Sequence, residues 1–242
     1  MTDTSALPAA FRGRRLVVFD LDGTLYRQAP LRRRMAVALA LDAVRRRDAR
    51  TASILRDYRR RREALADAGT MGFDEVLVRD CAASCGATDL EVREAVGEWI
   101  ERRPLPALRS CAVPGAHDLF DRLRAAGVRI GVWSDYPVAE KLAALGLRAD
   151  RIASATDPEV DVMKPDPRGL ALMMQSEGAD AAGTLMVGDR DERDGAAARA
   201  LGVDFLWRSD RARPGETGRV RDFTPRSLED AEPIAARRLA AA

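Results

Sequence analysis

Two aspartates separated by one residue, Asp20 and Asp22, follow the short apolar run at residues 16–19 and precede Gly23. The run is rich in β-branched and aromatic residues, which predicts a buried strand. Two carboxylates buried without a partner are costly, so a bound cation is the simplest compensation. Carboxylate oxygens are hard ligands of the kind that Mg²⁺ prefers. The alternative is a strand that runs out into a solvated acidic turn.

Two more predicted strands end in polar residues. Residues 129–134 end in Ser134, and residues 184–188 are followed by Asp189. Strands that alternate with single helices pair in parallel through right-handed crossovers, and ligands then bind beyond the carboxyl ends of the strands. We therefore expect Asp20, Ser134 and Asp189 to meet at one edge of a doubly wound parallel sheet in an α/β fold.

The remaining elements of this α/β region follow from apolar spacing and from glycine stops. The pattern predicts helices over 115–126, 137–145, 167–177 and 194–201, strands over 152–155 and 204–207, a loop over 208–224, and a last helix that begins at Thr224-Pro225.

The segment between the first and second strands is different in character. From residue 31 to about residue 68 the apolar residues fall at helical spacing, a further helix is expected over 73–85, and Thr88 with Glu91 forms a capping box that opens another. Pro104 and Pro106 end that helix. We expect a core domain of residues 1–26 and 110–242 and an inserted, smaller all-helical cap domain of residues 27–109.

Four motifs in order carry a resemblance to a known family. Asp20-Leu21-Asp22-Gly23-Thr24-Leu25, Val132-Trp133-Ser134-Asp135, Lys164-Pro165-Asp166-Pro167 and the acidic stretch 188–194 resemble motifs I to IV of the haloacid dehalogenase (HAD) superfamily. One motif could arise by chance, but four in order are specific. The resemblance implies a Rossmann-like core and, because the insertion lies between motifs I and II, a C1-type helical cap. Most members of the superfamily are Mg²⁺-dependent phosphatases, and the phosphatase branch is the one we expect here.

The resemblance also implies catalytic roles for the two aspartates. Asp20 would be the nucleophile that forms an aspartyl-phosphate, which divides hydrolysis into two easier steps. Asp22 would be the general acid and base that protonates the leaving oxygen and then activates water.

Metal and phosphate contacts are implied in the same way. Mg²⁺ would be held by Asp20, Asp22 (through its backbone carbonyl), Asp189 and Asp194, and the substrate phosphate would be bound by Ser134, Lys164 and Thr24. Asp191 and Asp194 could each supply the second acid of motif IV, and we favour Asp194.

Fold alone does not select the reaction, because the HAD fold hosts several. Asp22 argues against a dehalogenase, which needs no proton on its leaving group. The cap has no lysine for a phosphonatase Schiff base, and a P-type ATPase would need membrane helices. Phosphomonoester hydrolysis on a small phosphorylated metabolite is therefore expected. A sugar phosphomutase of the same fold and a basic-capped protein that binds a polyanion or nucleotide stay as alternatives.

Composition sets the remaining limits. A net charge of +2 argues against nucleic acid as a partner, and Cys81, Cys85 and Cys111 form no metal-ligand pattern. Residues 1–15 lack a signal-peptide core, and no apolar run could span a bilayer, so we expect a cytoplasmic protein, either a monomer or a dimer.

Charge is unevenly distributed along the chain. Residues 27–62 carry 13 Arg against three acidic residues, whereas the whole chain has only two lysines, Lys141 and Lys164. Runs of arginine are more often solvated helix faces than binding residues. We nevertheless expect one or two arginines near the start of the cap, with Arg32, Arg33 and Arg34 as the candidates, to contact the leaving group.

Overall fold

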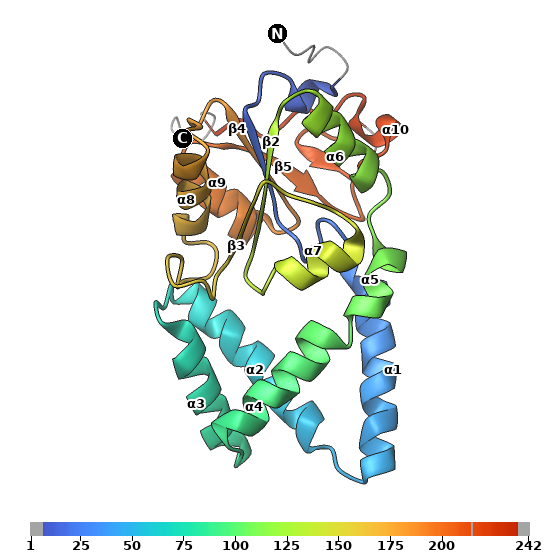
Figure 1. Cartoon of the computed structure of the whole chain (residues 1–242), viewed down its shortest axis with the longest axis vertical. Helices are drawn as coiled ribbons and strands as arrows, with labels where there is room; N and C mark the ends of the chain where they lie inside the picture. Colours follow the sequence, from blue (N-terminus) through green and yellow to red (C-terminus); the bar gives the residue numbers. More distant parts are fainter. Residues whose placement is uncertain (1–6, 214, 237–242) are drawn as a thin grey trace.

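The computed structural model describes residues 7–213 and 215–236. Six parallel strands form one sheet in the order β3-β2-β1-β4-β5-β6 (Figure 1). Their bounds are β1 Leu16–Phe19, β2 Arg129–Ser134, β3 Arg151–Ser154, β4 Thr184–Gly188, β5 Asp204–Arg208 and β6 Arg219–Val220. The central strand β1 therefore pairs with β2 on one side and β4 on the other, which confirms the predicted doubly wound α/β fold.

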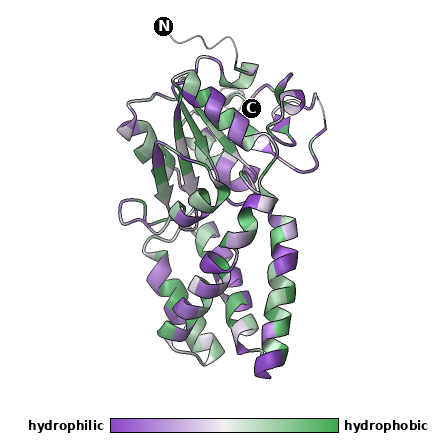
Figure 2. Cartoon of the chain, turned by 45° about the vertical axis from the view of Figure 1, so that its right-hand side comes forward, coloured by the Kyte–Doolittle hydropathy of each residue, from purple (hydrophilic) through white to green (hydrophobic). Residues whose placement is uncertain are grey.

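Helices cover both faces of this sheet. Successive strand residues point to opposite faces, so Val132 packs in one apolar cluster and Trp133 in another. Most strand residues are hydrophobic, as the green colour of the sheet in Figure 2 shows, although charged residues begin β2, β3 and β5. The flanking elements are the 3₁₀ helix Ala9–Phe11, α6 Ala116–Ala125, α7 Ala139–Leu145, α8 Arg168–Ser176, the π-helical turn η3 Asp191–Gly195, α9 Ala196–Ala200 and α10 Pro225–Leu228.

The segment between β1 and α6 is helical and lies beyond the carboxyl ends of the strands (Figure 1). It contains α1 Gln28–Arg46, α2 Arg50–Asp67, α3 Phe73–Cys85, α4 Asp89–Val96, the π-helical segment η2 Gly97–Arg102 and α5 Leu105–Cys111. Most of these helices share an apolar core in which Phe73, Leu77 and Val92 are fully buried, and Ala155 and Met163 from the segment after β3 also belong to it. The capping box of Thr88 and Glu91 opens α4 as expected.

Two of the inserted helices also contact the sheet side of the molecule. Leu31 of α1 and Leu108 of α5 belong to the same apolar cluster as the strands, so both ends of the insertion are anchored in the core. This arrangement supports the proposal of a cap domain, whose limits at residues 27 and 109 stay a prediction.

Local departures from the sequence expectations are small. The segment 208–224 is not all loop, because residues 219–220 form β6 beside β5. A two-residue strand has no periodic pattern to find. Pro104 ends one helical segment but directly precedes α5, where proline is tolerated at a helix start. Within the described residues, no helix is long and apolar enough to cross a bilayer.

The close packing between α8 and β2 leads us to a prediction about stability. A Cβ added at Gly169 would lie 2.3 Å from the Trp133 indole nitrogen, whereas one added at Gly97 would meet only the flexible Arg102 guanidinium at 3.0 Å. Gly169→Ala should lower the free energy of unfolding by about 1–3 kcal/mol through overpacking. Gly97→Ala, in a helical conformation, should be neutral or stabilising by up to about 1 kcal/mol.

Urea unfolding of both variants and the unchanged chain measures these free energies. Equal effects of the two substitutions would contradict the packing argument.

Candidate active site

Three strand ends meet where the sequence places them. Asp20 follows β1, Ser134 ends β2 and Asp189 follows β4, and β1 lies between the other two strands. The chain turns sharply at Gly23, with φ of +108°, and a Cβ there would lie 1.9 Å from a carboxylate oxygen of Asp189. Only glycine allows this close approach between the turn after β1 and the end of β4.

The Lys164 ammonium lies between two buried carboxylates. Its Nζ is 2.5 Å from Asp20 Oδ1 and 2.7 Å from Asp194 Oδ1, and all three side chains are less than a tenth exposed. Burial alone would lower the pKa of Lys164, but the two carboxylates raise it above its usual value, so the lysine stays protonated. Burial raises the pKa of Asp20, and Lys164 opposes that rise.

A second lysine holds Asp22 in the same way. Lys141 Nζ on α7 lies 2.7 Å from Asp22 Oδ1, Ser134 Oγ donates to Oδ2 at 2.8 Å, and the Tyr26 hydroxyl donates to Oδ1. Burial would raise the pKa of Asp22, but Lys141 and these hydrogen bonds lower it. The Asp22 carboxylate is thus held in one orientation by donors from β2, from α7 and from its own turn between β1 and α1.

Three carboxylates form a cluster that fits a hard divalent cation. One oxygen each from Asp20, Asp189 and Asp194 lies within 4.8 Å of the others. The Asp194 carboxylate accepts hydrogen bonds from Lys164 and from the Arg190 backbone N–H. The Asp189 carboxylate, in contrast, accepts no hydrogen bond from any residue described. Burial, followed by the charge of Asp194, raises the pKa of Asp189 to about 7. A cation that prefers oxygen ligands would compensate the negative charge of this unpaired carboxylate.

A large cavity opens from this cluster toward the inserted helices. Its volume is about 830 Å³, and its walls come from the strand ends, α1, α2 and η2. Arg62 of α2 is buried in the wall, donates to the Asp135 carbonyl and stacks 4.1 Å from the centre of the Tyr136 ring. The cavity therefore joins the strand ends to the inserted helices.

Helix α2 is also ion-paired to the loop after β4. Arg190 pairs with Glu63 at 3.1 Å, and Arg193 contacts both Glu63 at 3.2 Å and Asp67 at 2.5 Å. These contacts fix one wall of the cavity to the segment that carries Asp189 and Asp194.

Comparison with known proteins agrees with this geometry. The profile of haloacid dehalogenase-like hydrolases matches residues 14–202. The chain belongs to this family. The phosphoglycolate phosphatase of Rhodospirillum rubrum is 30% identical over 201 residues, which cover 78% of this chain and 77% of that protein.

Solved structures show the same fold at low identity. A 2-haloacid dehalogenase from Pseudomonas syringae pv. tomato has 21% identity and a TM-score of 0.60, covering 94% of this chain and 96% of its own. A magnesium-bound putative HAD hydrolase from Bacillus subtilis has 18% identity and a TM-score of 0.61, and the match covers 83% of this chain and 91% of that one. At these identities the likeness concerns the fold, and it includes dehalogenases as well as hydrolases of other kinds.

The family's motif residues lie together in this HAD hydrolase. Asp194 lies in the carboxylate cluster, whereas Asp191 pairs with Arg199 at 2.7 Å, beside α9. Thr24 is fully buried and donates to Asp20 Oδ2 at 2.9 Å, so it orients that carboxylate. A contact between Thr24 and substrate phosphate stays a prediction, as do the other assigned roles. The Asp22 carbonyl accepts a hydrogen bond from Gln28.

Several residues of the site were not found by sequence reasoning. Lys141, Tyr26 and Arg62 all line the cavity, yet none lies in a motif. The scarcity of lysine was a usable signal, because both lysines of the chain are buried against aspartates. Arg62 was expected on a solvated helix face and is instead buried, since four consecutive helical residues cannot all face solvent on a packed helix.

Two of the cysteines lie close to a carboxylate of the inserted helices. Cys81 and Cys85 lie with Asp57 in a group whose possible ligand atoms are within 4.8 Å of one another. Asp57 already pairs with Arg60 and with Arg61, and burial raises the pKa of the Cys81 thiol to about 12. Both properties oppose thiolate and carboxylate ligation there.

The buried pair of Lys141 and Asp22 makes a second prediction. Lys141→Met leaves the Asp22 charge without its cation, which should lower the free energy of unfolding by roughly 3–5 kcal/mol. Adding Asp22→Asn removes that charge, so the double variant should be more stable than Lys141→Met alone.

A double-mutant cycle by urea unfolding measures the coupling. Glu140→Gln, on the exposed side of α7, serves as the control and should change stability little. Strictly additive effects of the two substitutions would show that the pair is not coupled.

Proposed function

We propose that this protein is a Mg²⁺-dependent phosphomonoester hydrolase that acts through an aspartyl-phosphate on Asp20. The observation that carries the proposal is the position of Asp22, two residues after the nucleophile. Its carboxyl group lines the cavity and is held in place by Lys141 and Ser134. Displacing an alkoxide from phosphorus needs a proton donor, whereas displacing a halide does not. The relationship to a phosphoglycolate phosphatase supports the same choice.

The first step is attack by Asp20 on phosphorus. A carboxylate oxygen of Asp20 forms the new P–O bond, the bond to the leaving oxygen breaks, and Asp22 gives that oxygen a proton. Because Lys141 and its hydrogen bonds lower the pKa of Asp22 in the free protein, Asp22 must take up this proton from solvent as the substrate phosphate binds. In the second step Asp22 takes a proton from water, the water oxygen attacks phosphorus, and the bond to Asp20 breaks to release inorganic phosphate. Thr24 and Lys164 hold the two oxygens of Asp20 in place for this attack.

Mg²⁺ would be held by Asp20, Asp189 and the backbone carbonyl of Asp22, with Asp194 in support. When bound it supplies positive charge that offsets the carboxylates and the transferring phosphoryl group. Lys164 would contribute positive charge beside the phosphoryl oxygens, where negative charge builds up. Ser134 would donate to one of these oxygens by exchanging its present hydrogen bond to Asp22.

The substrate class follows from the same site. The cavity can hold a small phosphorylated metabolite, and the name of the relative makes phosphoglycolate the reference compound with which other substrates are compared. Residues 27–109 would act as the C1-type cap over the site. The cytoplasmic location and the monomeric or dimeric state stay predictions.

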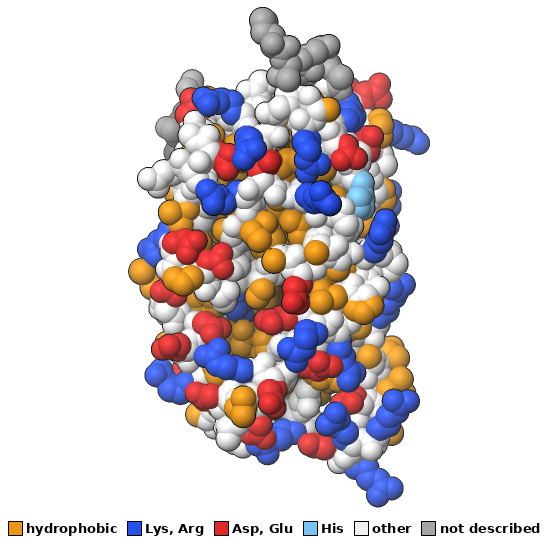
Figure 3. Space-filling model, in the orientation of Figure 1, with side chains coloured by type: hydrophobic (Ala, Val, Ile, Leu, Met, Phe, Trp, Pro, Cys, Tyr) orange, Lys and Arg blue, Asp and Glu red, His pale blue; other side chains and the backbone are white. Residues whose placement is uncertain are grey.

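The alternative of a polyanion-binding protein receives less support. Positive and negative side chains alternate over the helical half of the face seen in Figure 3. Several arginines there pair with acids, as Arg93 does with Asp74 at 2.9 Å. A pure binding protein would also have no need of Asp22. No observation favours the phosphomutase alternative.

The nucleophile makes a third prediction. Asp20→Asn is nearly isosteric and neutral, so it should abolish turnover of p-nitrophenyl phosphate while the circular dichroism spectrum stays unchanged. Asp22→Asn should instead let the phosphoenzyme accumulate with this good leaving group, because loss of the base slows breakdown more than loss of the acid slows formation.

Rapid acid quench and mass spectrometry of the Asp20-containing peptide detect the adduct. Substantial turnover by Asp20→Asn would remove Asp20 from this role.

Metal dependence makes a fourth prediction. Chelation should stop turnover and added Mg²⁺ should restore it, whereas Ca²⁺ should inhibit because its longer bonds and higher coordination number disturb the geometry. Asp189→Asn should weaken Mg²⁺ affinity more than Asp194→Asn, since Asp194 is already bound by Lys164. Activity titrations with Mg²⁺ measure both variants, and full activity in excess chelator would overturn the metal's role.

A further inference from the structure

The cavity is larger than a phosphate group and a two-carbon leaving group require. Its volume of about 830 Å³ falls in the range of pockets that enclose ligands of drug size. The catalytic carboxylates and Lys164 occupy only one end of it. The remaining part of the cavity is lined by residues of the inserted helices. This part is the space available to the leaving group of the substrate.

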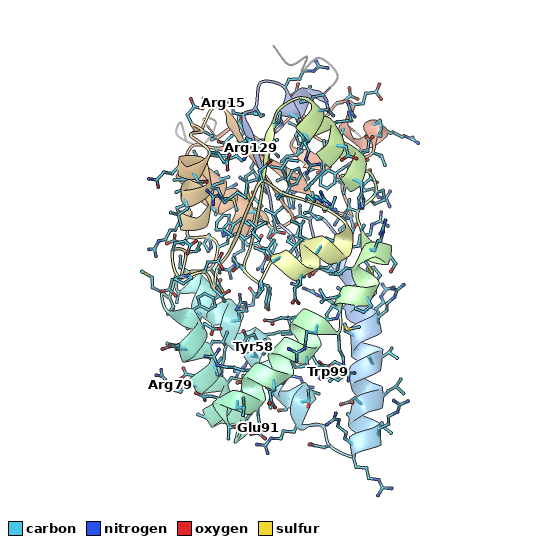
Figure 4. All side chains as sticks on the ribbon, viewed as in Figure 1. Arg15, Tyr58, Arg79, Glu91, Trp99 and Arg129 are labelled. Carbon is cyan, nitrogen blue, oxygen red and sulfur yellow. The ribbon has the colours of Figure 1, made fainter. Side chains whose placement is uncertain are left out.

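The wall away from the catalytic end is apolar. Helix α1 presents Leu31, Met35 and Leu39 at a spacing of four residues, which places them on one side of the helix. Across the cavity, Trp99 projects from η2 toward α1 (Figure 4). Other apolar lining residues of the inserted segment are Leu55, Ala66, Ile100 and Pro104. Water forms no hydrogen bonds with such a wall, whereas a hydrocarbon segment of a ligand would be stabilised there by removal from water.

Two arginines in this lining have no acidic partner. Arg32 and Arg59 form no ion pair with any residue in the described part of the chain, and both are exposed to the solvent of the cavity. The other three arginines of the lining are all engaged: Arg62 by the Asp135 carbonyl, Arg190 by Glu63, and Arg193 by Glu63 and Asp67.

The two arginines reach the cavity from different helices. Arg32 belongs to α1 and Arg59 belongs to α2, and both helices line the same cavity as Asp20 and Asp22. An anion bound in this cavity can therefore be approached by a guanidinium group from each of two walls.

We propose that the substrate is a phosphomonoester whose leaving group has an apolar body, several methylene groups long, and a second anionic group that Arg32 and Arg59 bind. The apolar body lies against Leu31, Met35, Leu39 and Trp99. A guanidinium fork binds a carboxylate or phosphate through paired hydrogen bonds. This inference rests on the proposed phosphatase function and extends it to the class of leaving group.

The test uses the full chain with Mg²⁺ and a series of phosphate esters of ω-hydroxy carboxylic acids, from phosphoglycolate to 6-phosphonooxyhexanoate. Hexyl phosphate, which lacks the carboxylate, is the matched substrate. Each added methylene should raise kcat/KM about fourfold, the gain expected for burying one such group. The longest acid should exceed hexyl phosphate by roughly ten- to a hundredfold, as a charged hydrogen-bonded contact predicts.

Variants of the two arginines test their part in this preference. Arg32→Gln and Arg59→Gln should each lower the ratio of kcat/KM for the acid to that for hexyl phosphate by about tenfold or more. The controls are Arg33→Gln and Arg56→Gln, which remove exposed arginines of the same helices outside the cavity lining and should leave the ratio unchanged.

Calorimetry gives a readout that needs no turnover. The unchanged protein should bind 7-phosphonoheptanoate at least tenfold more tightly than heptylphosphonate, and Arg32→Gln and Arg59→Gln should reduce that difference.

The outcomes separate the two levels of the proposal. Turnover of p-nitrophenyl phosphate without any gain from chain length or carboxylate would overturn the leaving-group inference and leave the phosphatase function standing. Absence of turnover with every phosphomonoester would overturn the function and the inference together. Equal losses from cavity and control arginines would show a general charge effect and would also overturn the inference.

Discussion

The Lys164 ammonium, buried between the carboxylates of Asp20 and Asp194, is the contact on which the site depends. Each of the three groups would be costly to bury alone, and each is compensated by the others. The lysine comes from the loop after β3, Asp20 follows β1 and Asp194 lies in η3 after β4, so the pairing joins three separate segments of the sheet edge. One further negative charge, that of Asp189, is left without a hydrogen-bond donor among the described residues, which is why a cation belongs beside it.

The site is assembled by the topology of the sheet. In a parallel sheet the carboxyl ends of neighbouring strands lie side by side, so residues far apart in sequence come together without long connections. Gly23 allows the turn after β1 to pass within reach of Asp189. Helix α2 then spans the opening, held to Asp135 and Tyr136 through Arg62 and to the loop after β4 through Glu63. The same helix that carries Arg59 into the cavity is therefore fixed at both sides of the catalytic end.

The sequence alone predicted those parts of the fold and of the site that depend on short patterns of neighbouring residues. Asp20, Ser134 and Asp189 were found because each ends a run of strand residues, and parallel pairing then required them to meet. Lys141 was not found, because it lies on α7 and its approach to Asp22 depends on how that helix packs against the strand ends. In the run of residues 59–62, helical periodicity shows that neighbours point in different directions but not which of them points inward. The structure shows Arg62 buried, Arg59 in the cavity lining, and Arg60 and Arg61 paired with Asp57.

The distribution of lysine and arginine has a physical reason. The chain carries 40 lysines and arginines together, yet only Lys141 and Lys164 are lysine, and each contacts one of the aspartates of motif I. An ammonium is a compact charge with three donors, so Lys164 can reach two carboxylates and the Trp133 carbonyl from one point. A planar guanidinium is larger and directs its donors in a fixed fork, so it could not reach the same three acceptors from one point. In this protein lysine accordingly lies under the catalytic carboxylates, and arginine lines the space where the leaving group is expected to bind.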